Sequence, residues 1–211
     1  IFLLYLFDIA DRMNRAANLC VIQIISSIGI ILNILSCIAF VQLNLKSKLR
    51  MYHFFFWVAF FHTCALLIVV FRPVLNTPDR SIRVSFSTVV YRWAFNTWIH
   101  NAFSMAALLS NLAVSVDRYL LVNKNLSNRF FVKIPVLFIE AIFLLIGLLC
   151  FVFPMFAYFI RPLDETNRFF TLDYTNFGRS PGFNQVRYVM FGIRDILLWI
   201  AFVIINGFLL Y

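Results

Sequence analysis

Five long apolar runs constrain this chain more than any other feature. Each run is about as long as the ~20 residues that an α-helix needs to cross a bilayer. A strand of a membrane barrel crosses with about 9–11 residues of alternating character, so continuous runs of this length argue against strands. The sequence therefore predicts an all-α, polytopic transmembrane helical bundle in a single domain. The predicted spans are residues 19–43, 51–71, 91–122, 134–160 and 188–211.

The composition excludes the main alternatives to a membrane protein. Of the 211 residues, 63% are hydrophobic and 13% are charged. A soluble domain carries about 25% charged residues and under half apolar ones. A single soluble core also has no room for 27 phenylalanines. A soluble globular enzyme and a disordered chain are both excluded.

The charges predict how the chain lies in the membrane. The net charge is +9, but the basic residues lie between the apolar runs and form no single stripe, so we predict no nucleic-acid partner. All four lysines fall in the connections between the first two runs and between the third and fourth. The positive-inside rule then predicts a multi-pass protein of the cell membrane, surrounded by the lipid bilayer, with an extracellular amino terminus. The other two connections carry arginines alongside acidic residues. This reduces the difference in positive charge between the predicted cytoplasmic and extracellular sides.

Motifs for catalysis or metal binding are missing from the sequence. Its four cysteines lie in or beside apolar runs, without a CxxC pair or a Cys/His ligand spacing. The patterns GxSxG, GxxxxGK[ST] and GxGxxG do not occur either. We predict no catalytic residue, no metal and no cofactor. The chain starts at Ile1 and ends at Tyr211 within an apolar run, so we expect it to be a piece of a longer protein.

The third run carries polar residues on one helical face. They lie near multiples of 3.6 residues from one another over about five turns. Because polar groups are costly in lipid, this face must look into the bundle or into a water-filled cavity. A hydrogen-bonding seam between helices is the other interpretation. The residues of this face are His100, Ser104, Asn111, Ser115 and Arg118.

The polar face ends in Asp117-Arg118-Tyr119, within SNLAVSVDRYLLV. Here the chain resembles the rhodopsin-like (family A) G-protein-coupled receptors, which place an acidic-Arg-Tyr triplet at the cytoplasmic end of the third helix. Two further matches are Gly29-Ile-Ile-Leu-Asn33, similar to the family's first helix, and Leu126, where the family keeps an apolar residue in its second inner loop. The resemblance covers all five runs and implies five helices of a seven-helix receptor.

The resemblance implies a receptor that senses an extracellular small molecule or peptide and activates a cytoplasmic heterotrimeric G protein. It places the ligand against the outer half of the third helix, at His100, Asn101 and Ser104, with Asp195 of the fifth helix as a further candidate.

Coupling to the G protein would involve the triplet and the second inner loop. By resemblance, Asp117 and its neighbour Arg118 form a pair that helps to hold the resting state, and Leu126 packs into the G protein. Asn33 and Asn111 are the candidates for helix packing. The coupling and activation candidates are Asp117, Arg118, Tyr119 and Leu126.

The chain also departs from the family's pattern. The run 51–71 lacks the acidic residue that the family uses in a sodium site, the fourth run has no Trp, and the fifth has no Pro. The chain lacks both cysteines of the family's conserved disulfide, because no cysteine lies near Trp93 or within 162–187. Divergent members of this kind resemble invertebrate chemosensory or peptide receptors.

A small transporter or channel subunit is the alternative from another class. Arg118, Glu140 and Asp195 would then be ionisable groups on a substrate path through the membrane. Glu140 lies near the predicted inner interface, where we expect its carboxylate to snorkel or to pair with a loop lysine. Asp195 is expected either to contact the ligand or to form a structural ion pair.

Overall fold

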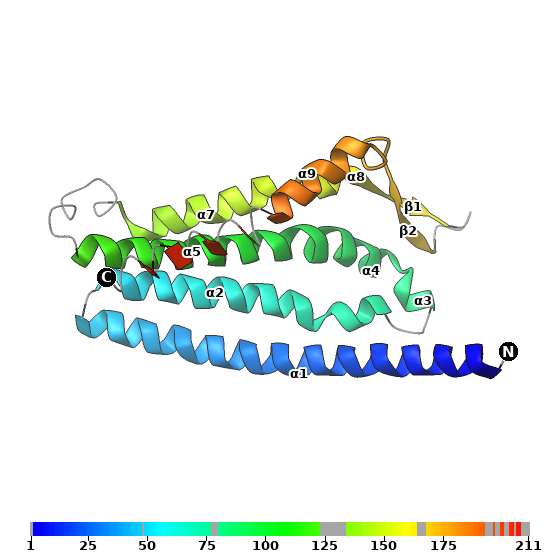
Figure 1. The fold of residues 1–211 in the computed structure, drawn as a ribbon, viewed down its shortest axis with the longest axis horizontal. Helices are drawn as coiled ribbons and strands as arrows, with labels where there is room; N and C mark the ends of the chain where they lie inside the picture. Colours follow the sequence, from blue (N-terminus) through cyan, green and yellow to red (C-terminus); the bar gives the residue numbers. More distant parts are fainter. Residues whose placement is uncertain are drawn as a thin grey trace.

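The computed structural model of the chain is a bundle of long helices that lie side by side (Figure 1). It describes residues 2–47, 49–76, 80–122, 134–163 and 168–192, with 196, 199–200, 203–204 and 206–207 near the carboxyl terminus. The long helices are α1 (Phe2–Ser47), α2 (Arg50–Val70), α5 (His100–Val122) and α7 (Val136–Cys150). Within these described ranges, the stretches long and apolar enough to cross a membrane are Cys20–Ser47, Arg50–Val70, Phe86–Leu120 and Val136–Ala157.

The predicted all-α membrane-helix architecture is confirmed at the level of fold class. The four stretches overlap the first four predicted spans. α1 starts well before residue 19, because the polar segment 8–18 holds no Pro or Gly to interrupt a helix. α9 (Pro181–Gly192) reaches the start of the fifth predicted span, 188–211. Half of that span lies outside the described residues, so five spans are not established.

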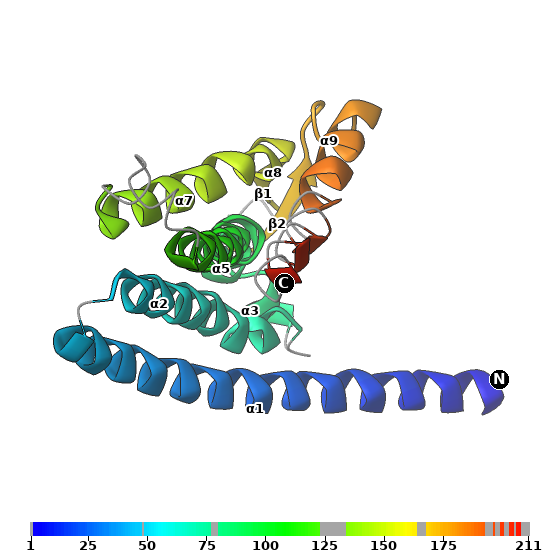
Figure 2. The same cartoon turned by 60° about the vertical axis from the view of Figure 1, so that its left-hand side comes forward.

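α5 lies at the centre of the bundle, between α2 and α7, and α1 lies on the outer side of α2 (Figures 1 and 2). Small side chains allow the close approach, as is usual for helices packed in lipid. A Cβ atom on Gly147 of α7 would lie 2.5 Å from the carbonyl oxygen of Ala102 on α5. The buried apolar residues between these three helices include Phe54, Phe61, Ala106, Ala107, Ala113, Val114 and Ile139.

α1 is peripheral, since only 6% of its most apolar stretch is buried. Its contact with α2 includes Gly29, where a Cβ would lie 2.9 Å from Cδ1 of Leu66. Gln23 Nε2 donates to the carbonyl oxygen of Val70, at 3.4 Å. Asn33, a predicted packing residue, is half-buried. The remaining apolar surface of α1 is suited to lipid.

The third long helix is built from three consecutive pieces: α4 (Phe86–Val90), the π-helical segment η2 (Tyr91–Ile99) and α5. Thr97 Oγ1 donates to the carbonyl of Arg92, five residues earlier, at 2.8 Å. Trp93 and Trp98 donate their indole N–H groups to the carbonyls of Met155 and Leu148, at 3.2 and 2.9 Å. π-Helical turns are rare and are frequent at functional sites. This segment precedes the predicted ligand-binding residues directly.

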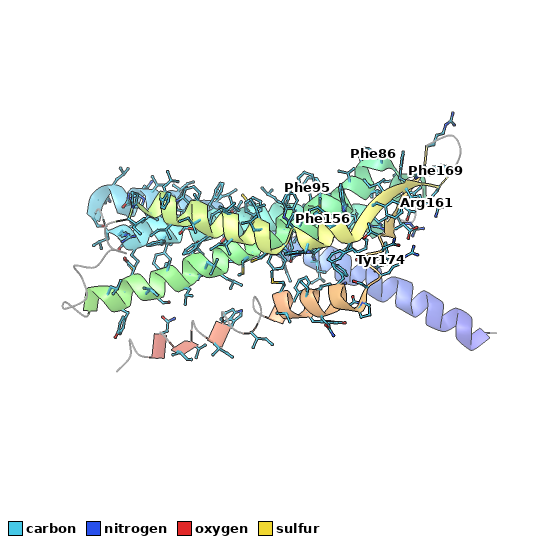
Figure 3. The ribbon with its side chains drawn as sticks, turned by 90° about the horizontal axis from the view of Figure 1, so that it is seen from above. Phe86, Phe95, Phe156, Arg161, Phe169 and Tyr174 are labelled. Carbon is cyan, nitrogen blue, oxygen red and sulfur yellow. The ribbon has the colours of Figure 1, made fainter. Side chains whose placement is uncertain are left out.

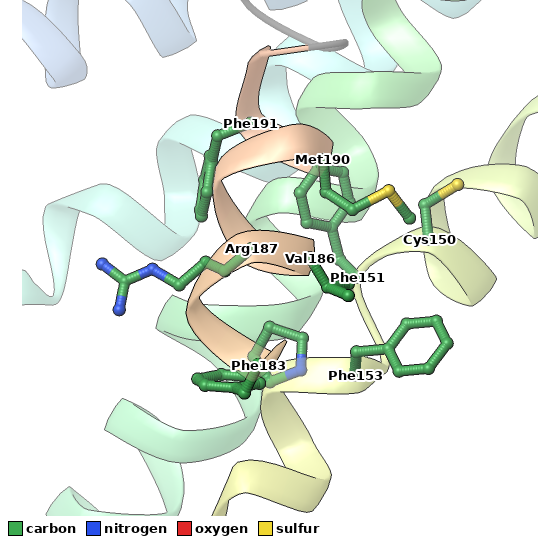
Figure 4. Close-up of a pocket in the computed structure, with 9 residues that line it drawn as sticks. Cys150, Phe151, Phe153, Phe183, Val186, Arg187, Met190 and Phe191 are labelled. Atoms are coloured by element: carbon green, nitrogen blue, oxygen red, sulfur yellow. The ribbon is translucent and has the colours of Figure 1, made fainter. Parts of the chain in front are cut away.

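The fourth predicted span, 134–160, is broken near Pro154. α7 ends at Cys150, and α8 (Phe153–Ala157) carries the proline in its first turn. Proline has no N–H for the preceding turn and clashes with it. α9 packs on this break, with the rings of Phe151 and Phe191 5.8 Å apart (Figure 4). The enclosed space there is about 10 Å³, room for one water at most.

Two strands follow α8, although the sequence argued against strands and predicted helix as far as Ile160. β1 (Tyr158–Pro162) pairs antiparallel with β2 (Phe170–Tyr174), with Tyr158 opposite Tyr174. The run-length argument concerned strands that cross a bilayer and does not apply to a hairpin of two five-residue strands. Two short segments rich in aromatic and β-branched residues, separated in the sequence by residues 163–169, are the signal that would have indicated it.

The hairpin is tied to the amino-terminal side of the third long helix. Phe170 N–H donates to the carbonyl of Val84, at 2.8 Å, and the ring of Phe170 packs edge-on against Phe86, with centroids 5.2 Å apart. Figure 3 shows Phe86, Arg161 and Tyr174 gathered at this end of the bundle.

Candidate functional site

The two ends of the bundle differ in what they carry. At one end lie the connection between α1 and α2, the carboxyl end of α5 and the start of α7 (Figure 1). This is the triplet end, named for Asp117–Tyr119. At the other end lie the amino terminus of α1 and the β1–β2 hairpin, and this is the hairpin end. Lys46 lies in the last turn of α1, at the triplet end, and the other three lysines lie outside the described residues, after α1 and α5 in the sequence.

A cavity of about 420 Å³ lies toward the hairpin end of α5. Its volume is within the range of small-molecule sites, about 300–1,000 Å³. His100, Asn101 and Ser104, the three predicted ligand-binding residues within the described ranges, all line it. We call it the His100 cavity. Its other lining residues are His62, Arg72, Asn96, Leu108 and Phe191.

Local hydrogen bonds hold the three predicted residues in place. His100 Nδ1 lies 3.3 Å from the carbonyl oxygen of Ala65 on α2. Asn101 Nδ2 donates to the carbonyl of Thr97 at 2.6 Å, and Ser104 Oγ donates to the carbonyl of His100 at 2.9 Å. The lone pairs of the Ser104 hydroxyl can therefore accept a ligand's hydrogen bond.

A second cavity, of about 740 Å³, adjoins the first and is lined by three arginines. Arg72 comes from the short 3₁₀ helix η1 (Arg72–Asn76), Arg83 from α3 (Arg80–Arg83) and Arg92 from η2. We call it the arginine cavity. Arg72 and Asn96 line both cavities, so the two lie next to each other. Sequence reasoning missed these residues, although Asn96 lies four residues before His100 and therefore on the same face.

Asp117 contacts Arg50 and not its neighbour Arg118. Its carboxylate is buried, and Oδ1 lies 3.9 Å from Nη1 of Arg50, the first residue of α2. Arg50 Nη2 also donates to the carbonyl of Ile134, at 2.9 Å. Successive helical side chains point about 100° apart, which explains why Asp117 and Arg118 meet different partners. The pair expected from the resemblance is therefore replaced by Asp117–Arg50.

Arg118 lies against α2 as well. Its guanidinium carbon is 5.4 Å from the centroid of the Phe55 ring, and its Nε is 3.2 Å from the sulfur of Met51. Such a cation–π contact stabilises an exposed cation by about 0.5–1 kcal/mol. Tyr119, the last triplet residue, is exposed. Leu126 lies outside the described residues.

Polar contacts in the middle of α5 form a seam between helices. Ser110 Oγ donates to Glu140 Oε2 of α7, and Asn206 Nδ2 donates to Ser115 Oγ, at 3.0 Å. Glu140 is only 1% exposed, so it neither snorkels nor reaches the solvent, contrary to expectation. Asn111, a predicted packing residue, is half-buried on the same helix. Of the predicted polar face, Ser115 therefore takes part in a contact between segments toward the triplet end, and His100 and Ser104 line the cavity toward the hairpin end.

The remaining candidates add no second site. A groove of about 560 Å³ at the triplet end is lined mainly by apolar residues of α1, α2 and α7, with His53 among them. Within the described part of the chain, no three His, Cys, Asp or Glu side chains are grouped to hold a metal ion. Asp195 lies outside the described residues.

The hairpin carries its own ion cluster. Asp173 Oδ1 accepts from the Tyr174 N–H at 2.8 Å, and its carboxylate lies 3.3 Å from Arg179 and 3.6 Å from Arg161. The backbone N–H first, and then the two guanidinium groups, hold the pKa of Asp173 below its ordinary value. The partners of Asp173 therefore all lie in the hairpin and in the segment that follows it.

No protein-family model matches the chain, and no curated protein matches it. Function is therefore inferred from the site itself.

Proposed function

We propose that the chain is part of a G-protein-coupled receptor whose ligand binds in the His100 cavity and whose triplet end faces a heterotrimeric G protein in the cytoplasm. The observation that carries the proposal is the placement of two features on one helix. His100 begins α5 beside a cavity, and Arg118 lies near its other end. At 1.5 Å per residue, eighteen residues separate them by about 27 Å, close to the thickness of a bilayer core.

Both features also touch the same neighbouring helix. His100 contacts the backbone of α2 at Ala65, and Arg118 contacts Met51 and Phe55 near the start of α2. A ligand that moves α5 relative to α2 at one end therefore affects contacts at the other. The ligand shifts the bundle only by the difference in its affinity for the two states.

The contacts suggest how the resting state is held. Asp117–Arg50 ties α5 to the start of α2, and Arg50 continues to the start of α7 through Ile134. The guanidinium group of Arg118 lies over the ring of Phe55. In the active state, by resemblance to the family, Arg118 turns toward the G protein and Leu126 packs into that partner. Cell-membrane localisation with an extracellular amino terminus belongs to the same proposal.

A G-protein activation assay on the full-length protein in cell membranes tests the proposal. Arg118→Ala and Leu126→Ala at matched surface expression should abolish coupling, and Arg179→Ala, on the hairpin side, should leave it unchanged. Wild-type coupling by both Arg118→Ala and Leu126→Ala would overturn the proposed function. The transporter alternative is less well supported, because neither Arg118 nor Glu140 lines any of the cavities described above.

A further inference from the structure

We infer that the arginine cavity binds an oxyanion, a carboxylate or phosphate group, carried by a soluble ligand whose remaining part occupies the His100 cavity. The inference deepens the proposed function, because it names the chemical class of the ligand. It is carried by three arginines that line one cavity and come from three separate elements.

Arg72 is the link between the two cavities. Its Nε donates to Asn96 Oδ1 at 2.7 Å, which fixes the plane of the guanidinium group. The two terminal nitrogens, Nη1 and Nη2, keep their hydrogens for a further acceptor. A fixed guanidinium group binds an oxyanion through two parallel hydrogen bonds, and this is why arginine is preferred over lysine where such groups are recognised.

Arg92 and Arg83 complete the positive wall. Arg92 Nη2 is directed to the carbonyl oxygen of Leu75 at 3.4 Å, a weak bond that holds the side chain at the cavity and neutralises no charge. Arg83 is exposed and lines the same space. Three cations around one water-filled cavity repel one another and attract an anion.

Among the described residues, no carboxylate neutralises the three arginines of this cavity. No acidic residue lines either cavity among the residues that the structure describes. Asp117 contacts Arg50 at the triplet end, and Glu140 is buried against Ser110. Asp173 is the described acid of the hairpin, and it is held by Arg161 and Arg179.

The adjoining His100 cavity suits the rest of such a ligand. Asn101 and Ser104 offer hydrogen-bonding groups, and Leu108 and Phe191 offer apolar contacts. An anionic group held at Arg72 would leave the uncharged part of the ligand within reach of these side chains, because Arg72 lines both spaces.

The test measures binding of defined anions to the full-length protein in phosphatidylcholine nanodiscs. Citrate and inorganic phosphate are titrated at constant ionic strength, with glycerol as the neutral control, and thermal unfolding is followed by tryptophan fluorescence. A saturable rise in Tm is expected with citrate, phosphate or both. Arg72→Gln, Arg83→Gln and Arg92→Gln should each weaken the apparent affinity about tenfold, since each removes a charge-assisted donor. Arg179→Gln is the matched control: it removes an ion pair of the hairpin and should lower the starting Tm, but its apparent affinity for the anions should equal that of wild type.

Several results would overturn the inference. One is the absence of a saturable shift with either anion, and another is an equal loss of affinity in Arg179→Gln and the cavity variants. A third arm repeats the titration in nanodiscs that contain phosphatidylglycerol. Loss of citrate and phosphate binding there would assign the cavity to lipid head groups and would reject a soluble ligand. The Tm measurement needs no G protein. Anion binding by a protein that does not activate a G protein would therefore contradict the proposed function and leave the inferred anion site standing.

Discussion

Arg50, the first residue of α2, lies 3.9 Å from the buried carboxylate of Asp117 on α5. Arg118, next to Asp117 in the chain, lies instead over the ring of Phe55. The two charges that the sequence suggested as partners therefore make separate contacts, and both contacts are with α2. The interface between α2 and α5 therefore holds two separate contacts of charged side chains.

Removal of either partner of the Arg50–Asp117 contact should raise ligand-independent activity. Asp117→Asn and Arg50→Gln each remove one charge that holds α5 to α2. A loss of about 1 kcal/mol would increase the population of the active state about fivefold. The double variant should exceed the stronger single variant only slightly, because both changes remove the same contact. Basal G-protein activation at matched surface expression measures this, and fully additive effects would contradict a shared contact.

The orientation of the bundle can be tested with inserted epitope tags. A tag after Ser47, in the connection between α1 and α2, should bind antibody only after permeabilisation of the cells. A tag at Asn176, an exposed position of the loop after β2, should bind antibody in intact cells and serves as the control. The reverse pattern would reject the proposed orientation and, with it, the receptor.

Substitution in the His100 cavity should reduce ligand potency without loss of expression. His100→Ala removes the contact with Ala65 and a polar group of the cavity wall, for which a loss of about tenfold is expected. His53→Ala, in the groove at the triplet end, is the control. Dose–response curves for the ligand, once it is identified, measure the effect. Unchanged potency in His100→Ala would remove this residue from the binding site.

The close packing of α7 on α5 should not tolerate a side chain at Gly147. A Cβ there would lie 2.5 Å from the carbonyl oxygen of Ala102, so Gly147→Ala must push the helices apart. We expect a destabilisation of about 1–3 kcal/mol, as for overpacked cores. Gly182→Ala, where the new atom meets nothing within 4 Å, should be neutral or slightly stabilising. Thermal unfolding of the two purified variants makes the comparison, and equal Tm values would contradict the packing.

The hairpin should loosen in acid through Asp173. Because its pKa is lower in the folded protein than in the unfolded chain, the ionised carboxylate stabilises the hairpin at neutral pH. This contribution is lost as the pH falls below about 4, where an aspartate begins to be protonated. Hydrogen exchange of the β1 and β2 amides, corrected for intrinsic rates, should accelerate there. Asp173→Asn should show the faster exchange already at neutral pH, and identical protection in the two proteins would exclude this role.

The sequence alone determined the fold class and pointed to three residues of the candidate site, His100, Asn101 and Ser104. Apolar runs of bilayer length leave helices as the one way to satisfy every backbone group in lipid, and this physical constraint acts locally. The helical repeat of 3.6 residues was equally sufficient to bring His100 and Ser104 to one face. A cavity at that face was one of two outcomes that the sequence left open.

Only the tertiary structure decided which side chains meet across helices. Arg72, Arg83 and Arg92 come from three short elements whose approach to Asn96 depends on the path of the chain between α2 and η2, and no periodicity encodes that path. The partner of Asp117 likewise depended on where α2 begins relative to α5. Helix geometry sets the direction of a side chain, but packing between helices decides what it contacts, because each contact depends on the combined shape of distant segments.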